Sequence, residues 1–433
     1  MALKSKSRYC AKDRIRELPV EVLRHILSFL PTKYAVRTSC LSSKWKNIWA
    51  SVPILNFHHD YFSGDAGFSM FVERVLFMRD SSDIQRFSLC CRQIQDFSRV
   101  DGWIRTAIRR NVVELSISAI FDRLRIYELP KSLCICKSLM FLELLLNFTI
   151  KVPTSGCFPS LKYLCVMLFG MADKDSMNRL FSQCPVLEVL TIKTVSGIRH
   201  VVLDINISAP ELKMLTIYLG RAGALHNLFV NAPKLENLNL CDSRLSNYIF
   251  ENVKSLIKAD IDLSDQFGIY DPGYVNRVTA LLAGISHVKY LSAPSFEGCC
   301  LPAFDSLKHL ELDLYDCNIF KSINELLKRS LNLEYLGANF NECIEEYLEH
   351  PWIQPNFVPN CLLSYLKTVS IRKFEGRQAD MEVAKFLLKN SKVLNNITIA
   401  TSDPQCAKKE LYKEFCFLAI SQLPIRVSPF ASI

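Results

Sequence analysis

The chain has 433 residues, of which 49% are hydrophobic and 22% charged, and its formal net charge is +9. This length accommodates two or three domains or one long repeat array, and the apolar content excludes an intrinsically disordered chain. No run approaches 18 uninterrupted apolar residues, and the first residues lack the apolar segment of a signal peptide. We therefore expect a soluble protein that is not secreted and that resides in the nucleus, the cytoplasm or both.

The positive charge is concentrated at the N-terminus. Residues 1–50 contain eleven Lys or Arg and three acids, a net charge of +8, whereas the other 383 residues carry only +1. A nucleic-acid groove needs basic side chains spread along its binding surface, and the electrically balanced remainder of the chain does not provide them. The basic head is either a solvated segment or a docking segment whose charge steers an acidic partner.

The first structured segment is expected to be helical. Apolar residues four positions apart predict an amphipathic helix over residues 19–30, ended by Pro31. We expect Thr32 to cap a second short helix, and Ser42 or Ser43 to cap a third. Three helices in about 40 residues cannot bury so many large apolar side chains among themselves, so the excess should contact a partner. The residues that repeat are Leu18, Val22, Ile26 and Leu30.

The same stretch, LPVEVLRHILSFLPTKYAVRTSCLSSKWKNIW, resembles an F-box. The resemblance lies in the Leu-Pro start, a helix ending Ile-Leu-Ser-Phe-Leu and the Cys-Leu-Ser-x-x-Trp segment; Val20 departs from it, because an acid commonly follows Leu-Pro. It implies that residues 13–55, after a flexible basic N-terminus over residues 1–12, dock on a Skp-family adaptor and so join a cullin-RING ubiquitin ligase. The adaptor-binding residues that it implies are Leu18, Pro19, Val22, Ile26, Leu27, Leu30, Pro31 and Trp45.

Most of the chain repeats a Leu-x-x-Leu-x-Ile/Leu unit, with intervals of 22, 26, 25 and 23 residues between the first five clear copies. This spacing is typical of leucine-rich repeats, in which each turn adds one strand to a parallel sheet, and we assign residues 56–354 to them. Clear copies begin at Leu139, Leu161, Leu187, Leu212, Leu235, Leu307 and Leu333, and weaker copies at Ile84, Val112, Leu256, Val288, Leu366 and Leu394.

The side chains between the core leucines of each unit should lie on the concave surface, because a strand alternates its faces with a period of two. Their mixed polar and aromatic chemistry suits the binding of a target protein, although an ordinary solvated sheet would have the same pattern. The candidate target-binding residues are Lys193, Tyr218, Asn239, His309, Glu311 and Tyr335. Other positions expected on this surface include Val189, Thr191, Met214, Thr216, Asn237 and Asp313.

Two later segments depart from the repeat. Residues 264–284 predict a turn at Asp271 and then an amphipathic helix over residues 275–282. Residues 359–399 resemble the FBD region of plant F-box proteins with leucine-rich repeats, through a Cys-Leu start, Leu-x-x-Val-x-Ile, Phe-x-Gly and a helix ending Leu-Leu-Lys-Asn. We assign residues 355–433 to an FBD domain and C-terminal cap, because the last repeat of a stack must hide its apolar end. A further amphipathic helix is expected through Leu411, Phe415 and Leu418.

The expected fold is of the α/β class: a three-helix F-box, then an irregular leucine-rich-repeat solenoid with a parallel sheet, closed by the FBD segment. The resemblance implies the substrate-recognition subunit of an SCF-type (Skp–cullin–F-box) E3 ubiquitin ligase, with a non-ligase repeat scaffold or a basic-headed nucleic-acid-binding protein as the alternatives. The sequence has no His-Glu-x-x-His, Gly-x-Ser-x-Gly or phosphate-binding glycine loop, and its 17 cysteines contain no Cys-x-x-Cys. We therefore expect no catalytic residue, cofactor or metal, no membrane association, and reduced thiols.

Overall fold

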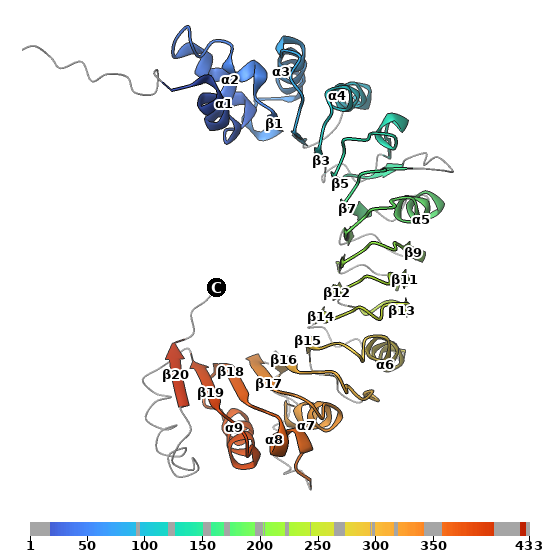
Figure 1. Cartoon of the computed structure of the whole chain (residues 1–433), viewed down its shortest axis with the longest axis vertical. Helices are drawn as coiled ribbons and strands as arrows, with labels where there is room; N and C mark the ends of the chain where they lie inside the picture. Colours follow the sequence, from blue (N-terminus) through green and yellow to red (C-terminus); the bar gives the residue numbers. More distant parts are fainter. Residues whose placement is uncertain are drawn as a thin grey trace, which may run out of the picture. The chain divides into compact units, whose positions relative to one another are not determined.

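The chain divides into two compact units, unit 1 over Met1–Val166 and unit 2 over Met167–Ile433. Figure 1 shows a computed structural model of the protein and labels its helices and strands. The structure describes residues 18–91, 96–119, 126–149, 157–168, 174–194, 202, 204–220, 225–242, 244–263, 273–294, 296, 299–315, 319–341, 357–401 and 425–429.

Unit 1 begins with short helices, as the apolar pattern predicted, but the third is only a 3₁₀ turn. The hydrogen bonds there run from residue i+3 to residue i, as in Ile48 N to Trp45 O at 3.4 Å, which aligns both side chains toward the same core. The Thr32 side chain caps no helix; its hydroxyl accepts the backbone N–H of Asn56 at 2.7 Å and ties the helices to the first strand. These elements are α1 (Val20–Ser28), α2 (Thr32–Arg37), η2 (Thr38–Cys40) and η3 (Ile48–Ser51).

The rest of unit 1 is a parallel sheet in the order β1-β2-β3-β5-β7, together with a separate two-stranded pair of β4 and β6. Helices α3 and α4 connect its first strands, as parallel connections require. The strands are β1 (Ile54–His58), β2 (Arg86–Cys90), β3 (Glu114–Ser118), β4 (Tyr127–Glu128), β5 (Phe141–Leu145), β6 (Phe148–Thr149) and β7 (Tyr163–Leu168). The helices are η4 (His59–Tyr61), α3 (Asp65–Met78), α4 (Phe97–Arg109) and η5 (Lys131–Leu133).

Unit 2 continues the same plan with a parallel sheet in the order β8-β10-β12-β14-β15-β16-β17-β18-β19-β20. Within this unit the strands form one side and helices α5, α6 and α7 the other (Figure 1). The strands are β8 (Val189–Thr194), β10 (Met214–Leu219), β12 (Asn237–Asp242), β14 (Lys258–Asp262), β15 (Tyr290–Pro294), β16 (His309–Tyr315), β17 (Tyr335–Asn341), β18 (Thr368–Phe374), β19 (Asn396–Thr401) and β20 (Ile425–Pro429). The helices are α5 (Lys174–Ser182), α6 (Tyr274–Gly284), α7 (Ile319–Arg329), α8 (Asn360–Ser364) and α9 (Gln378–Asn390).

Each repeat start named from the sequence is followed two residues later by a strand of the parallel sheet, so the predicted fold class is confirmed. The helix predicted over residues 275–282 is α6. Residues 1–12, residues 264–272 and the helix expected through Leu411 lie outside the described residues.

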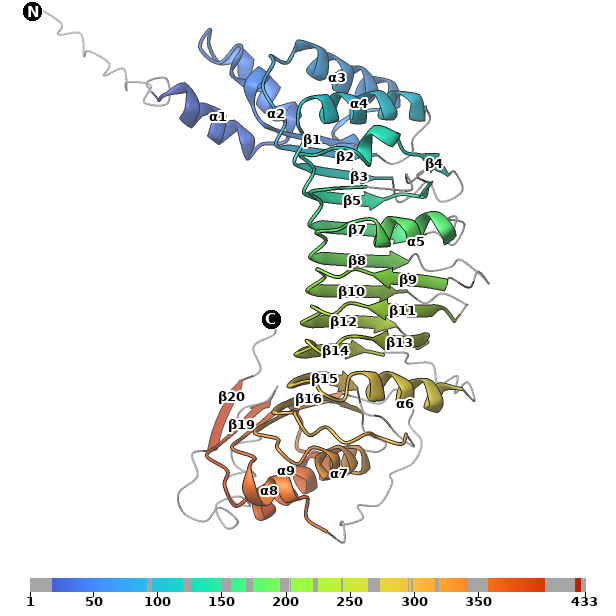
Figure 2. The same ribbon diagram turned by 45° about the vertical axis from the view of Figure 1, so that its right-hand side comes forward.

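The sequence pattern missed a second, three-stranded sheet in unit 2. Strands β9 (Asp204–Ser208), β11 (Asn227–Asn231) and β13 (Asn247–Glu251) pair in parallel on the return segments, where a helix was not required (Figure 2). Asparagine side chains link them, with Asn227 Nδ2 donating to Asp204 Oδ1 at 2.7 Å and Asn247 Nδ2 to Asn227 Oδ1 at 2.8 Å.

Beneath the parallel sheet of each unit, the core consists of ladders of inward-pointing side chains. Leu291, Leu310 and Leu336 occupy equivalent positions of three neighbouring strands and are almost completely buried. Every such side chain packs on its counterparts in the strands before and after it, so each repeat depends on its neighbours.

Among the described residues, every helix is too short or too polar to span a lipid bilayer.

We expect Leu310→Ala to lower the free energy of unfolding by about 2–5 kcal/mol, because truncating a fully buried leucine removes its contacts and leaves a cavity in the ladder. Urea unfolding followed by circular dichroism measures the change. The matched control is Lys308→Ala, two residues away on the surface, which should change stability by about 0.5 kcal/mol or less. Equal urea midpoints for the two variants would contradict the ladder account.

Candidate interaction surfaces

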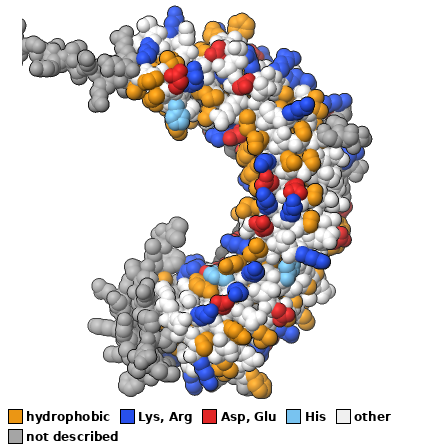
Figure 3. Space-filling view, viewed as in Figure 1, with side chains coloured by type: hydrophobic (Ala, Val, Ile, Leu, Met, Phe, Trp, Pro, Cys, Tyr) orange, Lys and Arg blue, Asp and Glu red, His pale blue; other side chains and the backbone are white. Residues whose placement is uncertain are grey.

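The helices at the start of unit 1 separate their apolar side chains into a core and an exposed surface. The core contains Leu23, Leu27, Ala35, Trp45, Ile48 and Val52, with Leu18 and Trp49 packed against it. A strip along α1 and α2 remains exposed, and Phe29, at 75%, is its most exposed member. Hydrophobic side chains gather over these helices in Figure 3. The members of this surface, here called the helical strip, are Val20, Val22, Ile26, Phe29, Leu30, Tyr34 and Leu41.

The structure therefore places the predicted adaptor-binding residues in two different environments. Val22, Ile26 and Leu30 lie on the helical strip, whereas Leu27 and Trp45 are buried beneath it. Leu18 is half-buried against the core, and Pro19 and Pro31 precede the first residues of α1 and α2. The sequence pattern missed Phe29, Tyr34 and Leu41, although each lies within the F-box-like stretch.

The helical strip lies among basic side chains. Residues 18–50 contain five Lys or Arg and a single acid, Glu21. Two of these cations hold the helices together: Arg24 Nε donates to Ser51 Oγ at 2.9 Å, and Lys44 Nζ donates to the carbonyl oxygen of Leu18 at 2.7 Å. Arg37 and Lys46 are exposed, so the strip has positive charge beside it.

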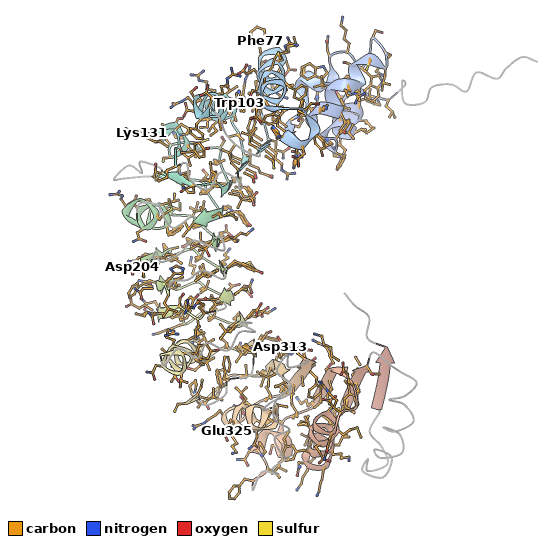
Figure 4. The ribbon with its side chains drawn as sticks, turned by 180° about the vertical axis from the view of Figure 1, so that it is seen from behind. Phe77, Trp103, Lys131, Asp204, Asp313 and Glu325 are labelled. Atoms are coloured by element: carbon orange, nitrogen blue, oxygen red, sulfur yellow. The ribbon has the colours of Figure 1, made fainter. Side chains whose placement is uncertain are left out.

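The second candidate surface, here called the strand face, is the side of the unit 2 sheet that carries the side chains between the core positions. Positive and negative side chains are intermingled along unit 2 in Figure 3, and Asp313 lies on this side in Figure 4, whereas Asp204 lies on the opposite one. Tyr218 is 54% exposed. Thr191 was expected to be exposed on this side, but it is buried. Its side chain is short, and Thr216 of β10 lies beside it in register.

The predicted target-binding residues form two groups on the strand face. Lys193 and Tyr218 are adjacent in register on β8 and β10, and Asn239 of β12 donates to Thr216 at 3.4 Å. The second group, His309, Glu311 and Tyr335, is on β16 and β17. Strands β14 and β15 separate the two groups.

The second group begins with a stack of aromatic rings. The rings of His309 and Tyr335 are parallel within 4°, with centroids 3.9 Å apart, and Tyr290 contacts the other side of His309 at 5.5 Å. This arrangement follows from the register, which places the three residues side by side at the start of β15, β16 and β17.

Beside the stack, Glu311 and Arg372 form an ion pair that crosses an intervening strand. Arg372 Nη1 and Nη2 donate to the two carboxylate oxygens of Glu311 at 3.2 and 3.1 Å. Between their strands lies Gly337 of β17; a Cβ atom there would be 2.0 Å from Oε2 of Glu311. The glycine therefore makes room for the carboxylate to lie across β17 and reach Arg372.

The cluster perturbs the titration of its members. Burial alone would raise the pKa of Glu311, but the His309 hydrogen bond, the Arg372 charge and the Tyr335 hydroxyl outweigh it and lower that pKa. Burial and the neighbouring charge of Glu311 raise the pKa of Tyr335. Glu311 therefore remains a carboxylate, fixed by three neighbouring side chains.

Neither Arg372 nor Gly337 was predicted from the sequence as part of this surface. Arg372 is 61 residues from Glu311 and belongs to the stretch interpreted as a cap. The available signal was its place six residues after Leu366, the same offset that places Asp313 after Leu307 on the strand face.

Unit 1 also contains a cavity of about 250 Å³ between α3 and α4. His59 Nε2 and Asp65 Oδ1 are 2.6 Å apart at its edge, and Cys91 also lines it. Burial raises the pKa of the Cys91 thiol to about 12, so it stays protonated and is a poor nucleophile at neutral pH. Among the described residues, no group of three or more His, Cys, Asp or Glu side chains is arranged to hold a metal ion.

Comparison with known proteins adds three family matches. The profile described as F-box domain matches residues 15–57, that described as "FBD-associated F-box protein At5g56370, LRR repeats" matches residues 100–259, and that described as FBD matches residues 354–399. The resemblances inferred from the residues are thereby confirmed.

Similar proteins from Arabidopsis thaliana align over most of the chain. "Putative F-box/FBD/LRR-repeat protein At4g00315" is 31% identical over 427 residues, which cover 89% of this chain and 92% of the relative. "F-box/FBD/LRR-repeat protein At4g00160" is 30% identical, with 93% and 89% covered. "FBD-associated F-box protein At5g38590" is 28% identical, with 96% and 100% covered.

The lowered pKa of Glu311 predicts a pH-dependent contribution to stability. A carboxyl group whose folded pKa lies below its unfolded value of about 4.3 stabilises the fold above that value, and the contribution is lost as the pH falls through the folded pKa. We expect Glu311→Gln to lower the urea midpoint at neutral pH and to match the wild type in acid. The control Glu325→Gln removes only a surface pair with Lys328 on α7 (Figure 4) and should have a smaller effect. A deficit of Glu311→Gln that persists unchanged in acid would show that the charge contributes nothing.

Proposed function

The chain belongs to the family of F-box proteins with leucine-rich repeats and an FBD region, and on that premise we propose that it is the substrate-recognition subunit of an SCF-type E3 ubiquitin ligase. An F-box in general binds a Skp-type adaptor, and leucine-rich repeats in general bind proteins. In the proposal, residues 13–55 dock on the adaptor, the repeats over residues 56–354 hold the target, and residues 355–433 complete and close the repeat stack.

The observation that carries the proposal is the helical strip. Seven large apolar side chains remain at least 37% exposed on α1, on α2 and in the segments that follow each of them, beside a small core of other apolar residues. Exposed apolar side chains in such a group mark a protein interface. The adaptor would contact Val22, Ile26 and Leu30 directly, together with Phe29 and Leu41, whereas Leu27 and Trp45 would support the strip from below.

The strand face supports the second half of the proposal. It is a continuous, ordered surface with aromatic and charged side chains in fixed positions, and such surfaces suit protein recognition. We propose Lys193, Tyr218, Asn239, His309, Glu311 and Tyr335 as target-contacting residues. Because the strands fix their backbones, little conformational entropy would be lost when a target binds.

In this proposal the chain has no catalytic step of its own. It holds a target lysine near the ligase and so raises its effective concentration, while ubiquitin transfer takes place on other subunits. The nucleus or the cytoplasm is the proposed location, because both compartments keep thiols reduced, as expected for the 17 cysteines of this chain. The helical strip favours a protein partner over a nucleic acid, because an apolar surface does not bind phosphates.

The test is co-purification of the full chain with a Skp-family adaptor. We expect the double variant Ile26→Ala and Leu30→Ala to lose binding, because truncated interface anchors cost on the order of 2 kcal/mol each, which together amounts to several hundredfold or more in Kd. Its melting temperature should stay close to that of the wild type, since both residues are over one-third exposed.

The matched control is Phe77→Ala on α3, which removes an 88% exposed apolar side chain of unit 1 outside the helical strip (Figure 4). It should leave adaptor binding unchanged. Equal recovery of adaptor by the double variant and the wild type would refute the proposal, as would a wild-type chain that recovers no adaptor.

A further inference from the structure

In the ion pair between Glu311 and Arg372 on the strand face, the carboxylate of Glu311 already has its hydrogen-bond partners within the protein. The Glu311 carboxylate receives two hydrogen bonds from Arg372, lies 3.4 Å from His309 Nε2 and receives a third from the Tyr335 hydroxyl; its side chain is only 18% exposed. Arg372 is different. Its Nη1 and Nη2 atoms donate to Glu311, and Nη2 also donates to the Tyr335 hydroxyl at 3.5 Å, but Nε has no partner among the described residues and the side chain is 41% exposed. The exposed group of this cluster is therefore the Arg372 guanidinium, a hydrogen-bond donor that the ion pair holds in a fixed orientation.

A bulge in β18 brings a second cation to the same place. The register between β18 and β19 shifts between Ile371 and Phe374, so Arg372 and Lys373 both fall between two buried core positions. Lys373 has φ = 54°, in the left-handed region that an L-residue adopts only at a cost. Its Nζ donates to Asn341 Oδ1 at 2.6 Å. Asn341 belongs to the strand face of β17, so the Lys373 side chain extends over that face as well.

The charged side chains around Arg372 determine which class of ligand could bind beside it. Glu311, Arg372 and Lys373 together carry a net charge of +1, which the neighbouring Asp313 reduces to zero. Both carboxylates already accept hydrogen bonds from their neighbours, Glu311 from Arg372 and Asp313 from Asn339 and Asn341 at 3.1 and 3.5 Å, so the N–H donors of the two cations remain for a ligand. A planar guanidinium offers paired N–H groups that match the two oxygens of a carboxylate. Because Glu311 already fixes its orientation, a second carboxylate can bind with little loss of side-chain entropy.

We propose that Arg372 and Lys373 bind an acidic side chain, Asp or Glu, in the target segment that docks on the strand face. This inference rests on the proposed function and adds the chemical class of the target. Glu311 and Gly337 are positioning residues in it, so Glu311 contributes to target binding through Arg372 and not by direct contact. Glu311 orients the guanidinium, and Gly337 leaves the space through which Glu311 reaches it. The FBD strand β18 would thus supply a recognition residue in addition to closing the stack.

The experiment selects binders from a random peptide library displayed on phage, with the full chain as bait and the Arg372→Gln variant in parallel. We expect the wild type to enrich peptides that share an Asp or Glu, and the variant to lose that enrichment. The matched control is Arg86→Gln in unit 1, which also removes an arginine from a cross-strand pair with a glutamate, Glu114, and should enrich the same acidic peptides as the wild type.

Two further variants separate positioning from simple charge attraction. Glu311→Gln raises the net charge of the cluster by one, so charge attraction alone would tighten the binding of a selected acidic peptide. If Glu311 instead holds the guanidinium in place, its loss should weaken that binding about tenfold.

Gly337→Ala changes no charge but places a methyl group where the Glu311 carboxylate lies, and it should weaken peptide binding by a similar factor. Its control is Gly102→Ala on α4, where an added Cβ has no neighbour within 4 Å. Melting temperatures identify any variant that fails to fold.

The outcomes are distinguishable from failure of the proposed function, which is read from adaptor co-purification. With the adaptor bound, three results would overturn the inference: enrichment of no peptide, enrichment of acidic peptides that Arg372→Gln still selects, or enrichment of basic peptides. In the last case, loss of enrichment by Asp260→Asn and Asp262→Asn would locate recognition on β14 instead. Without adaptor binding, acidic enrichment that depends on Arg372 would still support the site while the ligase proposal failed.

Discussion

The stacking of inward-pointing side chains from each strand onto the same positions of the next strand is the interaction on which both units depend. Leu215 packs beside Leu238 and Ile217 beside Leu240 because β10 and β12 run parallel in exact sequence register. A slip of one residue would turn every leucine toward water, so burial fixes the register strongly. No single turn can bury its own leucines, which is why the pattern must repeat along the chain.

Fixing the core also fixes what lies on the strand face. Once the inward residues are in register, the residues between them fall into rows, and neighbours in a row are residues far apart in the sequence. The His309–Tyr335 stack forms in this way without any turn or loop to arrange it. The pair of Glu311 and Arg372 forms across the strand between them because Gly337, the residue of that strand that lies between the two side chains, has no side chain. A regular scaffold and one small residue are therefore enough to build a polar cluster.

The sequence predicted the strands whose side chains form the core ladders. It predicted few of the features that the ladders do not determine. The leucine spacing located the strands from Ile84 to Leu394, because each depends on a local pattern of apolar residues. Strands β9, β11 and β13 were missed because they fill return segments, where a helix, a strand or a loop can equally cover the core. Of the candidate site, His309, Glu311 and Tyr335 were located by alternation alone, but Arg372 was not. Its contact with Glu311 depends on the missing side chain at Gly337, which produces no period in the sequence.

The backbone at Lys373 suggests that the FBD strand does more than close the stack. Val369, Ile371 and Phe374 of β18 are completely buried and would suffice to cover the last repeat. Of the four other non-glycine residues with positive φ among the described residues, two are asparagines, and Phe158 and Leu245 are completely buried, so packing of their own side chains holds them in that conformation. Lys373 is exposed and has no such packing, although asparagine or glycine would adopt the same backbone at lower cost, by roughly 1 kcal/mol. In the proposed role, the strained backbone places the lysine charge over the strand face, where it donates to Asn341 and lies beside the oriented Arg372.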